Sequence, residues 1–132
     1  MGTATEEDLK GFQQLLNAVL DDPDTVPAMV CGHPEWLECV NNSAETVLHW
    51  LAVEGHVEGI KLLHRLGSAI PPFALTHALQ AGHVETVDLL LTLGGSFGNI
   101  DPLKEICNPL WQFTPAKQKQ LLACLEAHGY KV

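Results

Sequence analysis

Basic residues and long apolar runs are both scarce in this 132-residue sequence. Seven lysines and arginines stand against 16 aspartates and glutamates, which gives a net charge of −9. Such a charge repels phosphate backbones and anionic lipid headgroups, so we expect neither nucleic-acid nor membrane binding. No apolar run approaches the ~18 residues of a membrane-spanning helix, and the first residues lack the basic and apolar segments of a signal peptide. We expect a cytoplasmic protein.

Cysteine is also sparse, and no two cysteines stand at C-x-x-C spacing. The four are Cys31, Cys39, Cys107 and Cys124. In the absence of a secretory signal we expect them to be reduced and mostly buried. Cys31 lies close to His33, but no second pair at zinc-site spacing accompanies it. The sequence therefore predicts no metal site, and it contains no P-loop, GxGxxG or HExxH motif that would indicate a cofactor.

Apolar material, in contrast, is plentiful, and charge is unevenly distributed. Hydrophobic residues make up 46% of the chain, enough for one packed domain, which we expect to span residues 1–132. Residues 1–58 contain eleven acidic residues and a single base, Lys10, for a net charge of −10, whereas residues 59–132 carry a net charge of +1. An acidic half of this kind attracts basic partners, although solubility alone would also explain it.

The most informative feature is an internal repeat. Residues 46–67 and 73–94 align without a gap and are identical at nine of 22 positions. Each copy holds two short apolar segments, each closed by a glycine that tolerates the left-handed backbone at a helix end. We therefore predict helices at 47–54, 57–66, 74–81 and 84–93. A two-helix unit cannot cover its own apolar face, so we expect the units to stack.

The repeat resembles the ankyrin repeat. The family's T-P-L-H and G-H motifs correspond to Thr46-Val47-Leu48-His49 and Gly55-His56, and the second copy keeps Gly82-His83. A third, weaker copy has Asn108-Pro109-Leu110-Trp111 in place of T-P-L-H. The resemblance implies an all-α, ankyrin-type helical-repeat solenoid of about three to four helix pairs. Its parts would be an N-terminal capping helix at 5–20 and repeats at about 24–43, 46–68, 73–95 and 108–129.

The hairpin fingers of the family have little room here. The period is 27 residues rather than the usual ~33, and the connection Gly67–Phe73 contains two prolines, which lack backbone donors. Only the segment 94–108 is long enough for a finger, and Asp101-Pro102 within it predicts an extra helical turn. We therefore expect binding to depend on the inner helices.

The resemblance implies a non-enzymatic module that binds a partner protein through the concave face of these inner helices. Carried over position by position, the contact residues are Glu45, Val53, Glu54, Pro72, Gln80 and Ala81, with Trp50 as a candidate anchor. The residues Thr46, His49, Gly55, His56, Gly82 and His83 are implied to have structural roles in the motif. Because Glu45 and Glu54 belong to the acidic half, we expect a partner with a basic patch; a sharper version is an inhibitor or immunity-type protein.

Two alternatives stay open. Gly94–Gly98 matches the G-x-S-x-G motif of hydrolases, which would make Ser96 a nucleophile assisted by His64 or His77, but this motif needs a preceding strand, and here it follows a predicted helix. The other alternative is a homo-oligomer in which exposed tryptophans bury one another. Trp36 is expected in the core, and Gly59, in the middle of a predicted helix, is expected to make room for a tryptophan.

Overall fold

The computed structural model describes residues 4–132, and they are helical, with no β-strand in that range. The prediction of an all-α protein is confirmed. The α-helices are α1 (Glu6–Asp21), α2 (Val26–Gly32), α3 (Val47–Glu54), α4 (Val57–Arg65), α5 (Pro72–Gln80), α6 (Val84–Thr92), α7 (Pro102–Cys107) and α8 (Pro115–Ala127). The 3-10 helices are η1 (Pro23–Thr25), η2 (Pro34–Glu38) and η3 (Pro109–Trp111). None of the helices described is both long and apolar enough to cross a membrane.

The chain divides into two compact units, each described here by itself. The first comprises the described residues up to Leu51 together with Glu58–Ala69, and the second comprises Ala52–Val57 and Ile70–Val132. The sequence analysis expects one domain over the whole chain. The division falls within the segment that carries the first copy of the internal repeat.

The first unit is built around α1. Thr5 caps this helix: its hydroxyl accepts a hydrogen bond from the Asp8 backbone N–H, and the Asp8 side chain accepts one from the Thr5 backbone N–H in return. One face of α1 is buried, and the helix packs against α2, η1 and η2. The buried apolar side chains of α1 and α2 are Phe12, Leu15, Leu16, Ala18, Val19, Val26 and Val30. The expected capping helix is therefore amphipathic and packed along one side.

The connection between η2 and α3 contains a tight turn instead of a hairpin finger. Val40 and Thr46 form a single antiparallel bridge, and Ala44 takes a left-handed conformation with φ 60°. The Asn41 side chain accepts hydrogen bonds from the backbone N–H groups of Ser43 and Glu45, which is typical of an Asx turn. This turn agrees with the expectation that the chain has little room for hairpin fingers between its helices.

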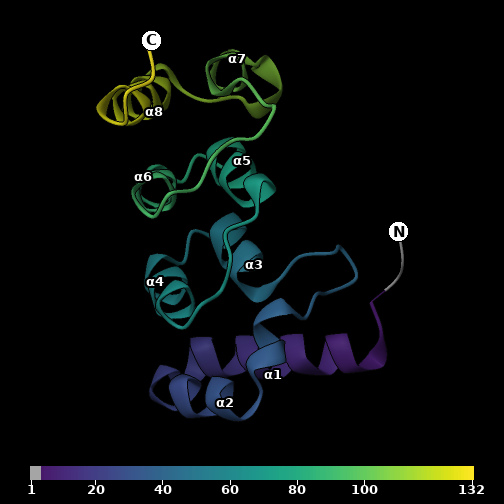
Figure 1. Ribbon diagram of the computed structural model, residues 1–132. Helices are drawn as coiled ribbons and strands as arrows, with labels where there is room; N and C mark the ends of the chain where they lie inside the picture. Colours follow the sequence, from purple (N-terminus) through teal and green to yellow (C-terminus); the bar gives the residue numbers. More distant parts are fainter. Residues whose placement is uncertain (1–3) are drawn as a thin grey trace. The chain divides into compact units, whose positions relative to one another are not determined.

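The second unit has two layers of helices. In Figure 1, α5 and α7 lie in one layer and α6 and α8 in the other, and contacts join α5 to α6, α5 to α7, α6 to α8 and α7 to α8. The fully buried side chains of these four helices include Leu75, Leu79, Val87, Leu90, Ile106, Leu121 and Leu125. Each helix thus gains from its neighbours the apolar cover that a single pair lacks.

The glycine-based predictions of the helix ends are accurate. The four repeat helices begin and end within two residues of the predicted bounds, and Gly55, Gly67, Gly82 and Gly94 all have positive φ. At Gly82, with φ +78°, a side chain would be strained whatever space surrounds it. The glycine pattern therefore locates these turns because the backbone there requires a residue without Cβ.

The third copy differs from its predicted register. At Asn108–Trp111, where the sequence places the first helix of the pair, only the 3-10 helix η3 forms. The Asn108 side chain accepts from Leu110 N–H at 2.9 Å, and Gln112 adopts a left-handed conformation with φ 55°. Helix α7, which begins after its cap Asp101, lies in the layer of α5 and contacts both α5 and α8. The extra turn predicted at Asp101-Pro102 is thus a complete helix, α7. It takes the place of the first helix in the last helix pair, whose second helix is α8.

Candidate functional site

The predicted contact residue Glu45 is held within its own loop. Its side chain is only 19% exposed, and one carboxylate oxygen accepts a hydrogen bond from the Asn41 side chain at 3.1 Å. The other oxygen lies 3.9 Å from Nε2 of His49, a buried histidine. Trp50, the candidate anchor, is partly buried on α3. Glu45 is therefore committed to internal contacts.

The other predicted contact residues belong to the second unit, where the structure separates them. Val53 is partly buried, and Glu54 is exposed at the end of α3. Pro72 and Gln80 stand at opposite ends of α5, about 12 Å apart along the helix axis, and Ala81 is exposed next to Gln80. Nε2 of Gln80 donates to Glu105 on α7 at 2.6 Å, so this residue connects two helices.

Several motif residues connect successive parts of the chain. The Thr46 hydroxyl accepts a hydrogen bond from the His49 backbone N–H at 3.3 Å, and His56 is partly buried next to Gly55. Nε2 of His83 donates to the carbonyl of Val53 at 3.0 Å.

In the third copy, Lys117 and Gln118 stand where glycine and histidine stand in the other two. The Lys117 ammonium group donates to the Gly82 carbonyl at 3.1 Å, and the Gln118 amide donates to the Ile106 carbonyl at 3.3 Å. Polar side chains thus bind backbone carbonyls of neighbouring segments at these turns.

The hydrolase motif lacks its expected surroundings in the described chain. Ser96 is exposed in an irregular loop after α6, whereas a nucleophile elbow stands between a strand and a helix. His77 stacks on the exposed ring of Phe73, with 6.2 Å between the ring centroids. His64 is partly buried on α4, in the first unit.

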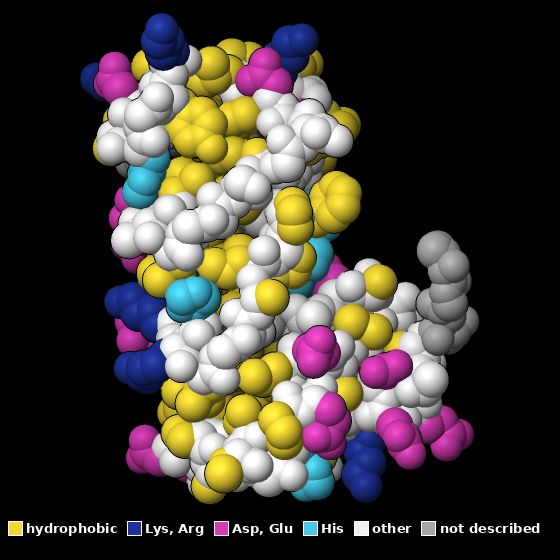
Figure 2. All heavy atoms as spheres, in the orientation of Figure 1, with side chains coloured by type: hydrophobic (Ala, Val, Ile, Leu, Met, Phe, Trp, Pro, Cys, Tyr) yellow, Lys and Arg dark blue, Asp and Glu magenta, His cyan; other side chains and the backbone are white. Residues whose placement is uncertain are grey.

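A cavity lies in the first unit, between α1 and η2. Its volume is about 520 Å³, and most of the residues that line it are polar or acidic. We call it the acidic pocket; its lining residues are Thr5, Glu7, Asp8, Lys10, His33, Glu35, Trp36, Glu38 and Cys39. Figure 2 shows acidic side chains gathered over this part of the molecule. Four carboxylates against one lysine give the pocket a formal charge of −3 with His33 neutral.

The pocket owes its shape to the close approach of α1 and η2 at Gly11. A Cβ atom built on Gly11 would lie 2.6 Å from Sγ of Cys39 and 2.8 Å from Cδ1 of Trp36. Gly11 therefore makes room for a tryptophan; the same role at Gly59 stays a prediction. The side chain of Trp36 can lie directly on the helix because no methyl group is there.

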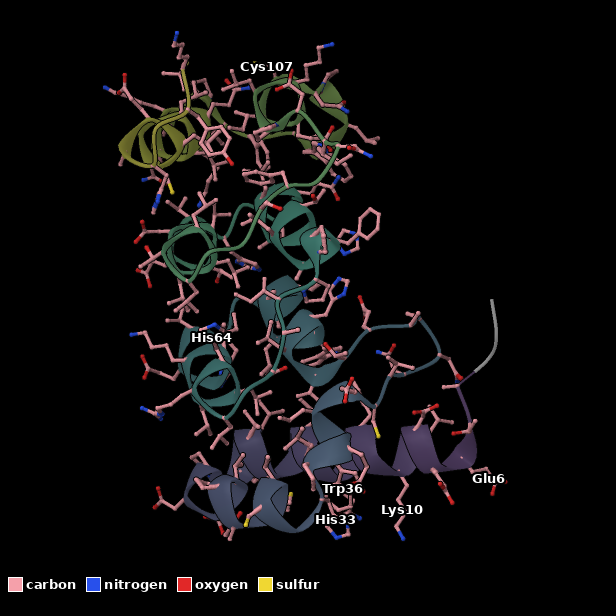
Figure 3. All side chains as sticks on the ribbon, viewed as in Figure 1. Glu6, Lys10, His33, Trp36, His64 and Cys107 are labelled. Carbon is pink, nitrogen blue, oxygen red and sulfur yellow. The ribbon has the colours of Figure 1, made fainter. Side chains whose placement is uncertain are left out.

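Trp36 differs from its prediction as a core residue. Pro34 begins a 3-10 helix instead of an α-helix, and Cys39 is already extended, so the segment is too short to bury the indole. Trp36 is only partly buried and stacks on His33, with 4.1 Å between ring centroids and 5° between planes. Figure 3 shows both rings on the same side of α1 as Lys10. The indole thus forms part of the pocket wall.

The pKa of the Cys39 thiol is affected by its burial and by the carboxylates around the pocket. Burial raises the pKa of Cys39 above its ordinary value, and the carboxylates of Asp8 and Glu35 raise it further. His33 also lies against a carboxylate, with Nδ1 3.4 Å from an oxygen of Glu35. An arrangement of carboxylates around a tryptophan suits a cation, because charge attraction and the face of the indole both favour one.

The sequence indicates the charge of this site but not its location. All four carboxylates belong to the acidic half, yet none is among the predicted contact residues. Asp8 and Glu35 are 27 positions apart, and they meet only because Gly11 lets the two segments touch. A glycine in the middle of an otherwise amphipathic helix is the one signal in the sequence that pointed to this contact.

Comparisons with protein-family models, with curated proteins and with solved structures give no match. The functional evidence is therefore the geometry of this chain.

Proposed function

We propose that this chain is a non-catalytic interaction module that binds a basic segment of a partner protein, and that the acidic pocket receives a lysine or arginine side chain of that segment. The observation that carries the proposal is the convergence of Glu7, Asp8, Glu35 and Glu38 around the partly exposed ring of Trp36. A guanidinium or ammonium group is the ligand that offsets this charge and stacks on an indole.

The uneven charge of the chain supports the same partner. The net charge of −10 in residues 1–58 attracts a basic surface from a distance, and the pocket lies within those residues. Binding would thus be steered by the acidic half and completed in the pocket. An inhibitor or immunity-type protein that caps a basic target is the sharper form of this proposal.

The ankyrin-like solenoid is the architecture that we propose for the scaffold. Support comes from the Gly-His turns, from the bonds of His83 and Lys117 to carbonyls of preceding turns and from the two layers of helices in the second unit. In such a scaffold the exposed Pro72 and Phe73 at the start of α5 would supply an additional apolar contact for the partner.

A peptide-binding experiment tests the proposal. A short fluorescent Lys- and Arg-rich peptide is titrated with the full chain, and an acidic peptide of equal length serves as the ligand control. We expect binding of the basic peptide that weakens as salt rises, because exposed charges are screened beyond ~8 Å at physiological ionic strength. The triple variant Glu7→Gln/Glu35→Gln/Glu38→Gln should bind at least ~10-fold more weakly, the equivalent of about 1.4 kcal/mol.

The matched control changes net charge equally without touching the pocket. Asp21, Asp22 and Asp24 are exposed in the same acidic half and outside the pocket lining, so their replacement by asparagine should reduce affinity only slightly. Equal losses in both triple variants would mean that net charge alone attracts the peptide. Binding that is insensitive to salt and to both variants would overturn the proposal.

A further inference from the structure

A cluster of three metal-ligating side chains lies in the second unit, apart from the acidic pocket. Oxygen, sulfur and nitrogen atoms of Asp88, Cys124 and His128 all lie within 4.8 Å of one another. Nε2 of His128 is 2.7 Å from a carboxylate oxygen of Asp88. An open cavity of about 440 Å³ reaches the cluster and is lined by Asp88, Cys124, Glu85 and Gln120 among others.

Helix geometry places these three groups together. Cys124 and His128 are four residues apart at the end of α8, so they share one face of the helix, and Asp88 projects from α6, which packs against α8. His128 is the C-cap of α8, followed by Gly129 with φ +92°. Tyr130 then meets Phe97 edge to face, with 5.8 Å between centroids, which fixes the backbone beyond the histidine.

Burial divides the cluster into a fixed side and an open side. Cys124 is buried and the His128 side chain is 21% exposed, whereas the Asp88 side chain is 62% exposed. A metal ion can therefore enter from the Asp88 side. Two of the three ligands would already be held by the packing of α8.

The donor set selects the metal. A thiolate and an imidazole exclude Mg²⁺ and Ca²⁺, which prefer oxygen ligands, and a carboxylate completes a set that suits Zn²⁺. In a tetrahedral zinc site neighbouring donors are about 3.3–3.8 Å apart. Rotations of the Cys124 and Asp88 side chains would reach that spacing. The ion would replace the hydrogen bond between Asp88 and His128, with the neutral imidazole carrying its proton on Nδ1 so that Nε2 binds zinc.

We propose that Asp88, Cys124 and His128 bind one Zn²⁺ ion, whose fourth position faces the cavity beside Glu85. Binding releases the Cys124 thiol proton to solvent as the zinc–sulfur bond forms. Three protein ligands with an open fourth position leave room for a water molecule or an external ligand. This proposal departs from the prediction of no metal site, because Asp88 is distant in sequence from the other two ligands.

Cobalt spectroscopy tests the site directly. The reduced full chain is titrated with Co²⁺, and the thiolate-to-cobalt charge-transfer band is recorded before and after Zn²⁺ is added. We expect the band to saturate at one Co²⁺ per chain and to disappear when Zn²⁺ displaces cobalt. The variant Cys124→Ser should lose the band, whereas Cys107→Ser, which alters an exposed cysteine of the same unit, should keep it.

A second variant keeps the test decisive if Cys124→Ser disturbs folding. Asp88→Asn changes an exposed side chain and should weaken cobalt and zinc binding at least ~10-fold, since even outer-shell changes have effects of that size. Absence of the band in the wild-type chain, its survival in Cys124→Ser or unchanged affinity in Asp88→Asn would each overturn the proposal. In those cases Asp88 and His128 would form only a hydrogen bond between α6 and the end of α8.

Discussion

At the scale of single residues, the space at Gly11 determines how closely α1 approaches η2. A methyl group there would collide with Cys39 and with the bulky ring of Trp36. Crowding of this kind costs about 1–3 kcal/mol. Because two contacts would fall below 3.0 Å, we expect a cost of about 2–3 kcal/mol, which exceeds the ~1 kcal/mol that alanine gains over glycine inside a helix. The same residue therefore governs both the packing of the first unit and the wall of the acidic pocket.

We expect Gly11→Ala to lower the free energy of unfolding by about 1–2 kcal/mol, measured by urea denaturation. Gly32→Ala is the matched control, because a Cβ on Gly32 at the end of α2 would meet nothing within 4 Å. This second variant should be unchanged or slightly more stable. If Gly11→Ala were as stable as the wild-type chain, the close contact between α1 and η2 would be wrong.

The Cys39 thiol provides a prediction on pH. Burial, followed by the carboxylates of Asp8 and Glu35, raises the pKa of Cys39 in the folded state. The folded chain therefore keeps a proton that the unfolded chain releases, so the free energy of unfolding falls as pH rises above the ordinary thiol pKa of ~8.5. This contribution is fully present below that pKa and is lost as pH passes the raised one.

Urea denaturation between about pH 7 and 10 measures this slope. The variant Cys39→Ala should show a shallower decline of stability with pH than the wild-type chain. Cys31→Ala, which removes an exposed thiol, should decline as steeply as the wild type. Identical slopes in the two variants would contradict the raised pKa of Cys39.

At the scale of helices and turns, the positions of the glycines predict where the helices end better than the apolar pattern does. Positive φ at Gly55 and Gly82 is a local requirement, so it can be read from the sequence. The register of the last pair depends on the Asn108 turn and on the left-handed Gln112. An Asn-Pro segment at that point is compatible with either a helix start or a turn, and the packing of α7 between α5 and α8 decides between them.

Variants at His83 test the hydrogen bond that links two successive turns. Its Nε2 donates to the carbonyl of Val53, one of the last four of α3, which lack partners within the helix. We expect His83→Ala to destabilise the chain by about 0.5–1.5 kcal/mol, the net contribution of a typical hydrogen bond, because this bond is partly buried. His83→Gln should recover part of that loss, because Gln118 already serves this purpose at the equivalent position of the third copy. Equal losses in both variants, by thermal or urea unfolding, would argue against the hydrogen bond.

At the scale of the whole molecule, the internal repeat predicts the helical class and the distribution of charged residues gives the acidic half, whereas both candidate sites depend on contacts between distant segments. The spacing of Cys124 and His128 is visible in the sequence, but Asp88 lies 36 positions before Cys124 and reaches it only through the packing of α6 on α8. The acidic pocket likewise requires η2 to lie on α1. The charge distribution therefore leads to the basic partner that we propose, and it could not predict the location of the pocket.

The bonds of His83 and Lys117 have a consequence for how the second unit loses its structure. Each joins a side chain near the start of one helix to a carbonyl of an earlier turn, 30 and 35 residues back. If α7 and α8 detach, the carbonyl of Gly82 therefore loses its hydrogen bond from Lys117. Unfolding that begins at the C-terminal end should consequently destabilise the preceding helices. We therefore expect the helices of the second unit to unfold in one cooperative transition and not pair by pair.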